Sequence, residues 1–150
     1  MKKRLISLLV ALCMAVTLLP VSALTAWAEE SSSNSTTLKI YNGYPVGSGG
    51  DGWSYDASTD TLDLHPASST EYDFLSIISG NGKVTKCKLT IGGNATIVRG
   101  NFDNTVINNG KISGGYFYSS SPLTNHGTII DGLFVSAVSN ESEGKIENGT

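Results

Sequence analysis

One phrase repeated in the last third of the chain constrains its fold more than any other feature. The pattern G-[KT]-I-x-x-G-x-F occupies residues 110–117 and 127–134, and a shortened copy begins at residue 144. Residues 95–102 carry it without the first glycine. The isoleucines of the four copies, at positions 97, 112, 129 and 146, lie 15, 17 and 17 residues apart. A short period with one apolar pair per copy is typical of a solenoid, in which each repeat buries its apolar side chains against its neighbours.

The repeat predicts which side chains face inward. Residues five apart on a straight strand point to opposite faces, so the isoleucine and phenylalanine of one copy share a core only if the chain bends between them. Glycine supplies the bend at Gly115 and Gly132, and a second glycine precedes each isoleucine. We expect buried rows formed by Ile112, Phe117, Leu123, Ile129 and Phe134. We also expect Asn108, Asn125 and Asn140 to form a hydrogen-bonded ladder that holds a turn.

The remaining sequence predicts strands and loops. Residues 53–56 and 61–64 alternate apolar with polar and predict a hairpin with a four-residue loop. Residues 38–41, 74–78 and 87–91 are further expected strands, and residues 65–73 are expected to be irregular. The predicted fold class is all-β, with a short N-terminal β-hairpin region that leads into a parallel β-helix (β-solenoid). The last copy is incomplete, so we expect truncation at the C-terminus, with further repeats or a capping partner there.

The N-terminus predicts export. Residues 1–28 combine a basic start, an apolar run and a small-x-small site at Ala26 to Ala28, which together predict a signal peptide. The apolar run is shorter than the roughly 20 residues of a membrane span, so no stable membrane insertion is expected after its removal. The expected domains are a flexible spacer at 29–37, an N-terminal β region at 38–91 and β-solenoid rungs at 92–150. The expected localisation is secreted or extracellular. Association with the cell surface is compatible with this expectation.

Charge and cysteine content exclude some functions. Removal of residues 1–28 takes away three of ten basic residues and none of thirteen acidic ones, which leaves a formal charge of −6. An acidic chain with scattered lysines argues against binding to nucleic acid. Cys87 is then the one remaining cysteine, so no internal disulfide is expected. Two roles stay open for it, a small side chain packed in a strand and a reactive or intermolecular thiol.

The outward residues around the core phenylalanines give the candidate binding site. Tyr116 and Tyr118 flank Phe117, and stacking places them beside Leu133 and Val135. Aromatic side chains with polar tips suit sugar rings, which also have apolar and polar faces. We therefore predict Tyr116 and Tyr118 as ligand-binding residues. A contact to another domain, or an ordinary solenoid exterior, would use the same side chains.

No pattern predicts a catalytic site, a metal site or a cofactor. The carboxylates between Asp56 and Asp73 lie in loops or at exposed strand positions, without an apolar setting that would raise a pKa for glycoside hydrolysis. His65 and His126 are far apart and have no partner at the spacing of metal ligands.

Two segments carry a family resemblance. W-S-Y-D at residues 53–56, followed by T-L-D-L at 61–64, resembles the opening of secreted surface proteins of Gram-positive bacteria that are often described as carbohydrate-binding. The downstream Asn-Gly, Ile and Phe rungs look like the β-helical repeats of such proteins. The resemblance covers most of residues 38–150 and carries over no catalytic residue. It implies a bacterial adhesin and a polysaccharide, or a host or envelope glycan, as partner.

Three functions remain open from the sequence. The first is a non-catalytic, secreted or cell-surface adhesion or glycan-binding segment of a larger repeat protein. The second is a structural stalk or spacer. The third is a polysaccharide lyase or hydrolase built on a β-helix.

Overall fold

A computed structural model describes residues 37–118, 120 and 122–150, which belong to one compact unit, Asn34–Thr150. The predicted signal peptide at 1–28 and all but the last residue of the predicted spacer at 29–37 lie outside the described residues. This unit is all-β with mostly parallel sheets, apart from one helical turn. No helix among its described residues has the length and apolar character to cross a membrane.

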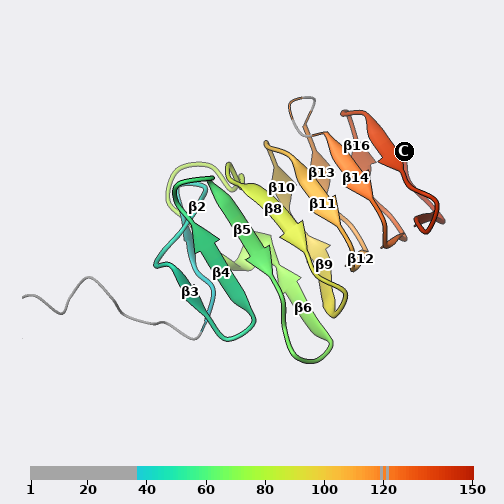
Figure 1. The fold of residues 1–150 in the computed structure, drawn as a ribbon. Helices are drawn as coiled ribbons and strands as arrows, with labels where there is room; N and C mark the ends of the chain where they lie inside the picture. Colours follow the sequence, from blue (N-terminus) through green and yellow to red (C-terminus); the bar gives the residue numbers. More distant parts are fainter. Residues whose placement is uncertain (1–36, 119, 121) are drawn as a thin grey trace, which may run out of the picture. The chain divides into compact units, whose positions relative to one another are not determined.

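Parallel strands are stacked in three sheets, which Figure 1 shows running from green to red. The first sheet contains β5 (Thr61–Leu64), β8 (Lys88–Ile91), β11 (Val106–Asn108), β14 (Leu123–Asn125) and β17 (Val138–Asn140). The second contains β6 (Thr70–Asp73), β9 (Ala95–Arg99), β12 (Lys111–Ile112), β15 (Thr128–Ile129) and β18 (Lys145–Ile146). The third contains β10 (Asn101–Phe102), β13 (Tyr116–Phe117) and β16 (Leu133–Phe134). We call one pass of the chain through these sheets a rung.

Equivalent residues of successive repeats pair in register. Ile97, Ile112, Ile129 and Ile146 follow one another across the second sheet. Ile112, Phe117, Leu123 and Ile129 are at most 1% exposed, which confirms these predicted inward positions. Phe134 packs on the same core but is only half-buried, and Ile146 is 46% exposed. The parallel pairing begins before residue 92, because β5 and β6 already pair with β8 and β9.

Phenylalanine rings form a continuous stack inside the third sheet. The ring centroids of Phe102 and Phe117 lie 5.0 Å apart, and those of Phe117 and Phe134 lie 4.8 Å apart. Phe74 extends the stack in the other direction with an edge-on contact at 5.1 Å. Large rings in van der Waals contact bury much apolar area, so this column is a major part of the core.

The predicted asparagine ladder is present, with two buried members and the exposed Asn140 at its end. The Asn108 amide donates to the side-chain oxygen of Asn125, and the Asn125 amide donates to that of Asn140, both at 2.7 Å. Asn108 and Asn125 are fully buried. In register with them, earlier rungs carry the apolar Leu64 and Ile91. The ladder also holds the corner, because the Asn108 side-chain oxygen accepts from the Gly110 N–H at 3.1 Å.

Glycine is required at both corners of a rung, for two different reasons. Gly115 and Gly132 have φ values of +141° and +155°, which side chains rarely adopt. Gly110 and Gly127 instead lie against the neighbouring rung. A Cβ on Gly127 would sit 2.2 Å from the Gly110 carbonyl oxygen, so no side chain fits there without moving the backbone.

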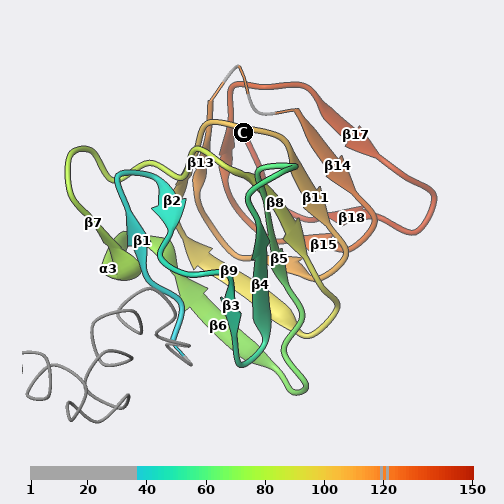
Figure 2. The ribbon, with the colours of Figure 1, turned by 60° about the vertical axis from the view of Figure 1, so that its left-hand side comes forward.

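The predicted hairpin is confirmed at the N-terminal end of the first sheet. There β4 (Trp53–Asp56) pairs antiparallel with β5 and is followed outward by β3 (Gly49–Gly50). A separate small sheet contains β1 (Ile40–Tyr41), β2 (Tyr44–Pro45) and β7 (Ile78–Ser79). Figure 2 shows this sheet beside α3 (Phe74–Ile77).

Two sequence predictions are wrong in this region. Residues 65–73 are not irregular throughout, because Thr70–Asp73 pairs with β9 as strand β6. Residues 74–78 do not form a strand, because Phe74–Ile77 is a helical turn and Ile78 starts β7. The physical reason is the Asp73 side chain, which accepts from the Leu75 N–H at 3.2 Å and starts the turn as its N-cap.

Candidate functional site

The predicted tyrosines lie together on the outside of the third sheet. Tyr116 and Tyr118 flank the buried Phe117, and their ring centroids are 4.6 Å apart with an angle of 60° between the rings. Tyr118 is 36% exposed, and Tyr116 is half-buried. Alternation along the strand explains this, because the neighbours of an inward residue face outward.

The next rung extends this surface with aliphatic side chains. Leu133 pairs in register with Tyr116, and Leu133 and Val135 are 45% and 54% exposed. The Val135 N–H donates to the Phe117 carbonyl at 2.9 Å, so parallel pairing fixes the spacing of the two rungs. We call Tyr116, Tyr118, Leu133 and Val135 the tyrosine face. The preceding rung places the polar Asn101 in register with Tyr116, which ends the apolar surface on that side.

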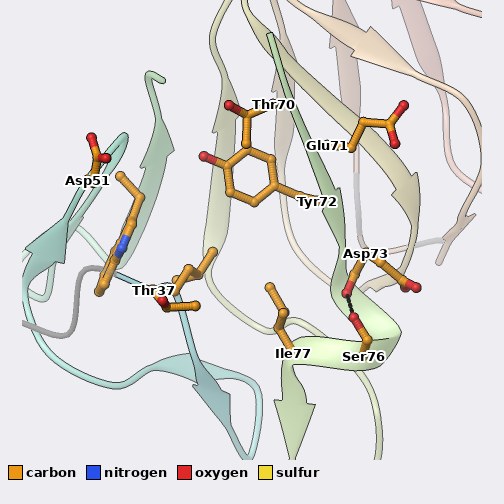
Figure 3. Close-up of a pocket in the computed structure, with 10 residues that line it drawn as sticks. Thr37, Asp51, Thr70, Glu71, Tyr72, Asp73, Ser76 and Ile77 are labelled. Atoms are coloured by element: carbon orange, nitrogen blue, oxygen red, sulfur yellow. Dashed lines mark hydrogen bonds between the residues drawn. The ribbon is translucent and has the colours of Figure 1, made fainter. Parts of the chain in front are cut away.

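A cavity of about 460 Å³ lies in the N-terminal region, where the sequence predicted no site. Figure 3 shows β6 on one side of it, α3 below and Asp51 across from β6. Thr70 and Tyr72 project from the cavity side of β6, and Glu71 projects from the other side. The lining residues come from three separate segments: Thr37, Leu38, Asp51, Trp53, Thr70, Glu71, Tyr72, Asp73, Ser76 and Ile77.

Two almost fully buried aromatic residues, Tyr72 and Trp53, are part of the cavity wall. Tyr72 is 9% exposed and its hydroxyl donates to the Gly52 carbonyl oxygen at 3.3 Å. Burial raises the pKa of the Tyr72 phenol, and the nearby Asp51 carboxylate raises it further, so the hydroxyl stays protonated. Trp53 is 1% exposed, and its indole N–H has no hydrogen-bond partner among the described residues. A buried donor without a partner lowers the stability of the folded state, and this nitrogen is itself closed off from solvent.

Hydroxyl groups on the cavity wall are held by backbone carbonyls. The Thr70 hydroxyl donates to the Ser68 carbonyl at 3.0 Å, and the Ser76 hydroxyl donates to the Asp73 carbonyl at 2.8 Å. Each such hydroxyl uses its one proton internally and keeps lone pairs for further bonds. The wall therefore offers acceptors at several fixed positions.

Two carboxylates of the N-terminal region, Asp73 on the cavity wall and Asp56 outside it, have structural partners. Asp73 forms an ion pair with Arg99, and the hydrogen bond from that guanidinium is the main cause that lowers the pKa of the Asp73 carboxyl. The Asp56 carboxylate accepts from the Ser58 side chain and backbone and from Thr59, and the Ser58 side chain contributes most to its lowered pKa. A lowered pKa keeps a carboxyl ionised, which suits hydrogen-bond acceptance and not proton donation.

Other residues considered in the sequence lie apart from both places. His65 lies 3.7 Å from Asp63 on the exposed surface of the hairpin region. Within the described ranges, no group of three His, Cys, Asp or Glu side chains is arranged to hold a metal ion. Cys87 is 2% exposed, and burial raises the pKa of its thiol to about 12, with the Asp60 carboxylate as a second cause. A buried protonated thiol is a poor nucleophile, which favours the packing role for Cys87.

Comparison with protein families, with curated proteins and with solved structures finds no match for this chain. The two surfaces are therefore interpreted from their own geometry.

Proposed function

We propose that this chain is a parallel β-helix that serves as a non-catalytic, glycan-binding segment of a secreted surface protein. Support for the β-helix comes from the register, in which each repeat adds one strand to each of the three sheets. Support for export comes from the predicted signal peptide at residues 1–28.

The observation that carries the binding proposal is the tyrosine face. Its two rings lie 4.6 Å apart on the outside of strands whose inner side is fully packed by Phe117. Aromatic rings on a rigid backbone offer apolar area to the C–H face of a sugar, and their hydroxyls can bond to the sugar's own hydroxyls. Little ordering entropy opposes binding, because the backbone is already fixed by the neighbouring rungs.

Binding to one such face is expected to be weak. Two rings and two aliphatic side chains give a contact on the order of −4 to −6 kcal/mol, which corresponds to a dissociation constant from about millimolar to tens of micromolar. Firm adhesion would then depend on several binding faces acting together, as further rungs or several copies of the protein would provide.

The alternative to glycan binding is a role as a structural spacer, which the two columns of stacked side chains favour. The phenylalanine stack and the asparagine ladder both run along the stacking direction, so they stiffen the unit whether or not its surface binds a ligand. An enzymatic role has less support, since the carboxylates with lowered pKa values are engaged in structural bonds.

An NMR titration separates binding from a spacer role. The exported full-length chain is titrated with soluble polysaccharides and their oligosaccharides, as wild type and as the Tyr116→Ala/Tyr118→Ala variant. We expect chemical shift changes at residues 116–118 and 133–135 in the wild type, and their loss in the variant. Tyr41→Ala/Tyr44→Ala is the matched control, because these tyrosines are 57% and 43% exposed on a different sheet. If the Tyr116→Ala/Tyr118→Ala variant showed the same shift changes as the wild type, the tyrosine face would not be the binding site. If no glycan caused shift changes in the wild type, the result would favour the spacer role.

A further inference from the structure

We propose that the cavity between β6, α3 and the β3–β4 hairpin binds a neutral hexopyranose unit of a polysaccharide. This inference rests on the proposed glycan-binding function and adds a second site, a cavity partly open to solvent, to the tyrosine face. The cavity volume of about 460 Å³ lies within the range of roughly 300–1,000 Å³ that is usual for small-molecule sites.

The shape and lining of the cavity select a ring with both apolar and polar parts. Trp53, Tyr72, Leu38 and Ile77 supply apolar surface, and Figure 3 shows Ile77 projecting from α3 toward Tyr72. Aromatic and aliphatic walls of this kind pack against the C–H groups of a sugar ring.

The polar groups of the wall select a ligand with many hydroxyl protons. The hydroxyls of Thr70, Tyr72 and Ser76 each donate to a backbone carbonyl, so they face a ligand mainly as acceptors. The Asp51 carboxylate is a fourth acceptor, on the opposite side from β6 in Figure 3. A polyhydroxylated ring can donate in all these directions.

The charge of the cavity wall disfavours acidic sugars, and the positions of its hydrogen-bond acceptors favour a neutral sugar over a simple cation. The Asp51 carboxylate on the wall disfavours an anionic sugar such as a uronate, because like charges repel. A small ammonium ion would satisfy Asp51 and stack on an aromatic ring, but it would leave the acceptors along β6 and α3 without donors. The spread of acceptors around the cavity therefore favours the neutral sugar.

Tryptophan fluorescence reports on this site directly. Trp53 is the single tryptophan after the predicted cleavage site, since the other is Trp27. The chain without residues 1–28 is titrated with oligosaccharides of glucose, mannose, galactose and N-acetylglucosamine, and in a separate arm with tetramethylammonium chloride. We expect one of the neutral hexose series to shift or quench the Trp53 emission with saturation, and tetramethylammonium to produce no saturable change.

Three variants test the wall. Tyr72→Phe and Thr70→Val each remove a hydroxyl acceptor at nearly constant volume, and Asp51→Asn replaces one acceptor oxygen with an NH2 donor and removes the charge. Each variant should raise the dissociation constant by about fivefold to tenfold. The matched control is Asp63→Asn, which removes a carboxylate from the adjacent β5 strand outside the cavity wall and should bind as the wild type does. Circular dichroism verifies that each variant is folded.

The Tyr116→Ala/Tyr118→Ala variant separates failure of this site from failure of the tyrosine face. If it retains the Trp53 response and the cavity variants lose it, the cavity is the sugar site whatever the tyrosine face does. NMR shifts at the tyrosine face without any saturable Trp53 response would overturn the cavity and leave the proposed function standing. Equal affinity in Tyr72→Phe, Thr70→Val and the wild type, a response only to tetramethylammonium, or no binding of any saccharide would also overturn it.

Discussion

The core side chains in this fold pack mainly against equivalent side chains of the neighbouring rungs. Phe117 contacts the rings of Phe102 and Phe134 in the neighbouring rungs, at 5.0 and 4.8 Å, and is completely buried. Its removal therefore affects three rungs at once.

We predict that Phe117→Ala lowers the free energy of unfolding by about 3–5 kcal/mol, as large core truncations do. Phe134→Ala should cost less, because Phe134 is only half-buried and has a ring contact on one side. Urea denaturation followed by circular dichroism measures both. Equal losses for the two variants would contradict the described difference in burial.

The Asp73–Arg99 pair predicts a pH dependence. The folded-state pKa of Asp73 lies below its ordinary value of 3.8, so its contribution to stability is present above about pH 4 and disappears as pH falls through the folded value. Asp73→Asn should therefore destabilise the protein at pH 7, and its difference from the wild type should shrink below pH 4. Thermal melts across this pH range test it. Glu71→Gln, an exposed change on the same strand that leaves the Asp73–Arg99 pair intact, is the control and should leave the contribution of Asp73 in place.

Strands and corners depend on contacts between adjacent backbones. Where Gly127 approaches the Gly110 carbonyl, even a methyl group has no room, whereas a Cβ on Gly93 would meet nothing closer than 3.9 Å.

Gly127→Ala is expected to cost about 1–3 kcal/mol, as overpacking does. Gly93→Ala should stay within about 0.5 kcal/mol of the wild type, as exposed substitutions usually do. A denaturation midpoint for each variant is sufficient to compare them. If the two variants were equally stable, the close approach of the rungs at this corner would be wrong.

The asparagine ladder is the polar counterpart of the phenylalanine stack. Asn125 accepts from Asn108 and donates to Asn140, so Asn125→Ala leaves a buried amide of Asn108 without this acceptor. We expect a loss of about 1–3 kcal/mol from the unsatisfied groups. The exposed Asn109→Ala serves as control and should be near neutral. Hydrogen exchange at residues 108–110 and 125–127 should accelerate in Asn125→Ala alone.

The repeated strands and the hairpin with its alternating pattern could be predicted from the sequence, whereas strand β6 and the turn α3 could not. Ile112 and Ile129 were placed correctly because their neighbours recur at the same positions of each copy. Strand β6 has one large apolar residue, Tyr72, and depends on pairing with β9, a contact that its own sequence does not reveal. The cavity was missed because its walls come from segments around residues 37, 51 and 72, which only the fold brings together.

At the scale of the whole unit, each rung interacts mainly with the one before it and the one after it. The stability of such an array is approximately a sum of terms for single repeats and for neighbouring pairs. Residues 110–126 form one period of 17 residues, the separation that Asn108 and Asn125 also have.

A second copy of residues 110–126 inserted after residue 126 should be accommodated as an additional rung. We expect the longer protein to remain folded, with an unchanged β-type circular dichroism spectrum and a larger denaturant m-value, because more surface is buried. Insertion of the same 17 residues in scrambled order is the control and should destabilise the protein. If the ordered and scrambled insertions behaved alike, the rungs would not be interchangeable units.

Because the rungs share one register, the buried positions that stabilise the fold are distinct from the exposed positions on its exterior. The columns of Ile, Phe and Asn are common to successive rungs, whereas the outward position of the third sheet is Asn101, Tyr116 and Leu133 in turn. Natural selection can therefore change the exterior one residue at a time without disturbing the packing beneath it. Tandem duplication of 17 codons would supply fresh exterior positions on the same framework, so a lineage carrying this fold can acquire new recognition surfaces by simple copying.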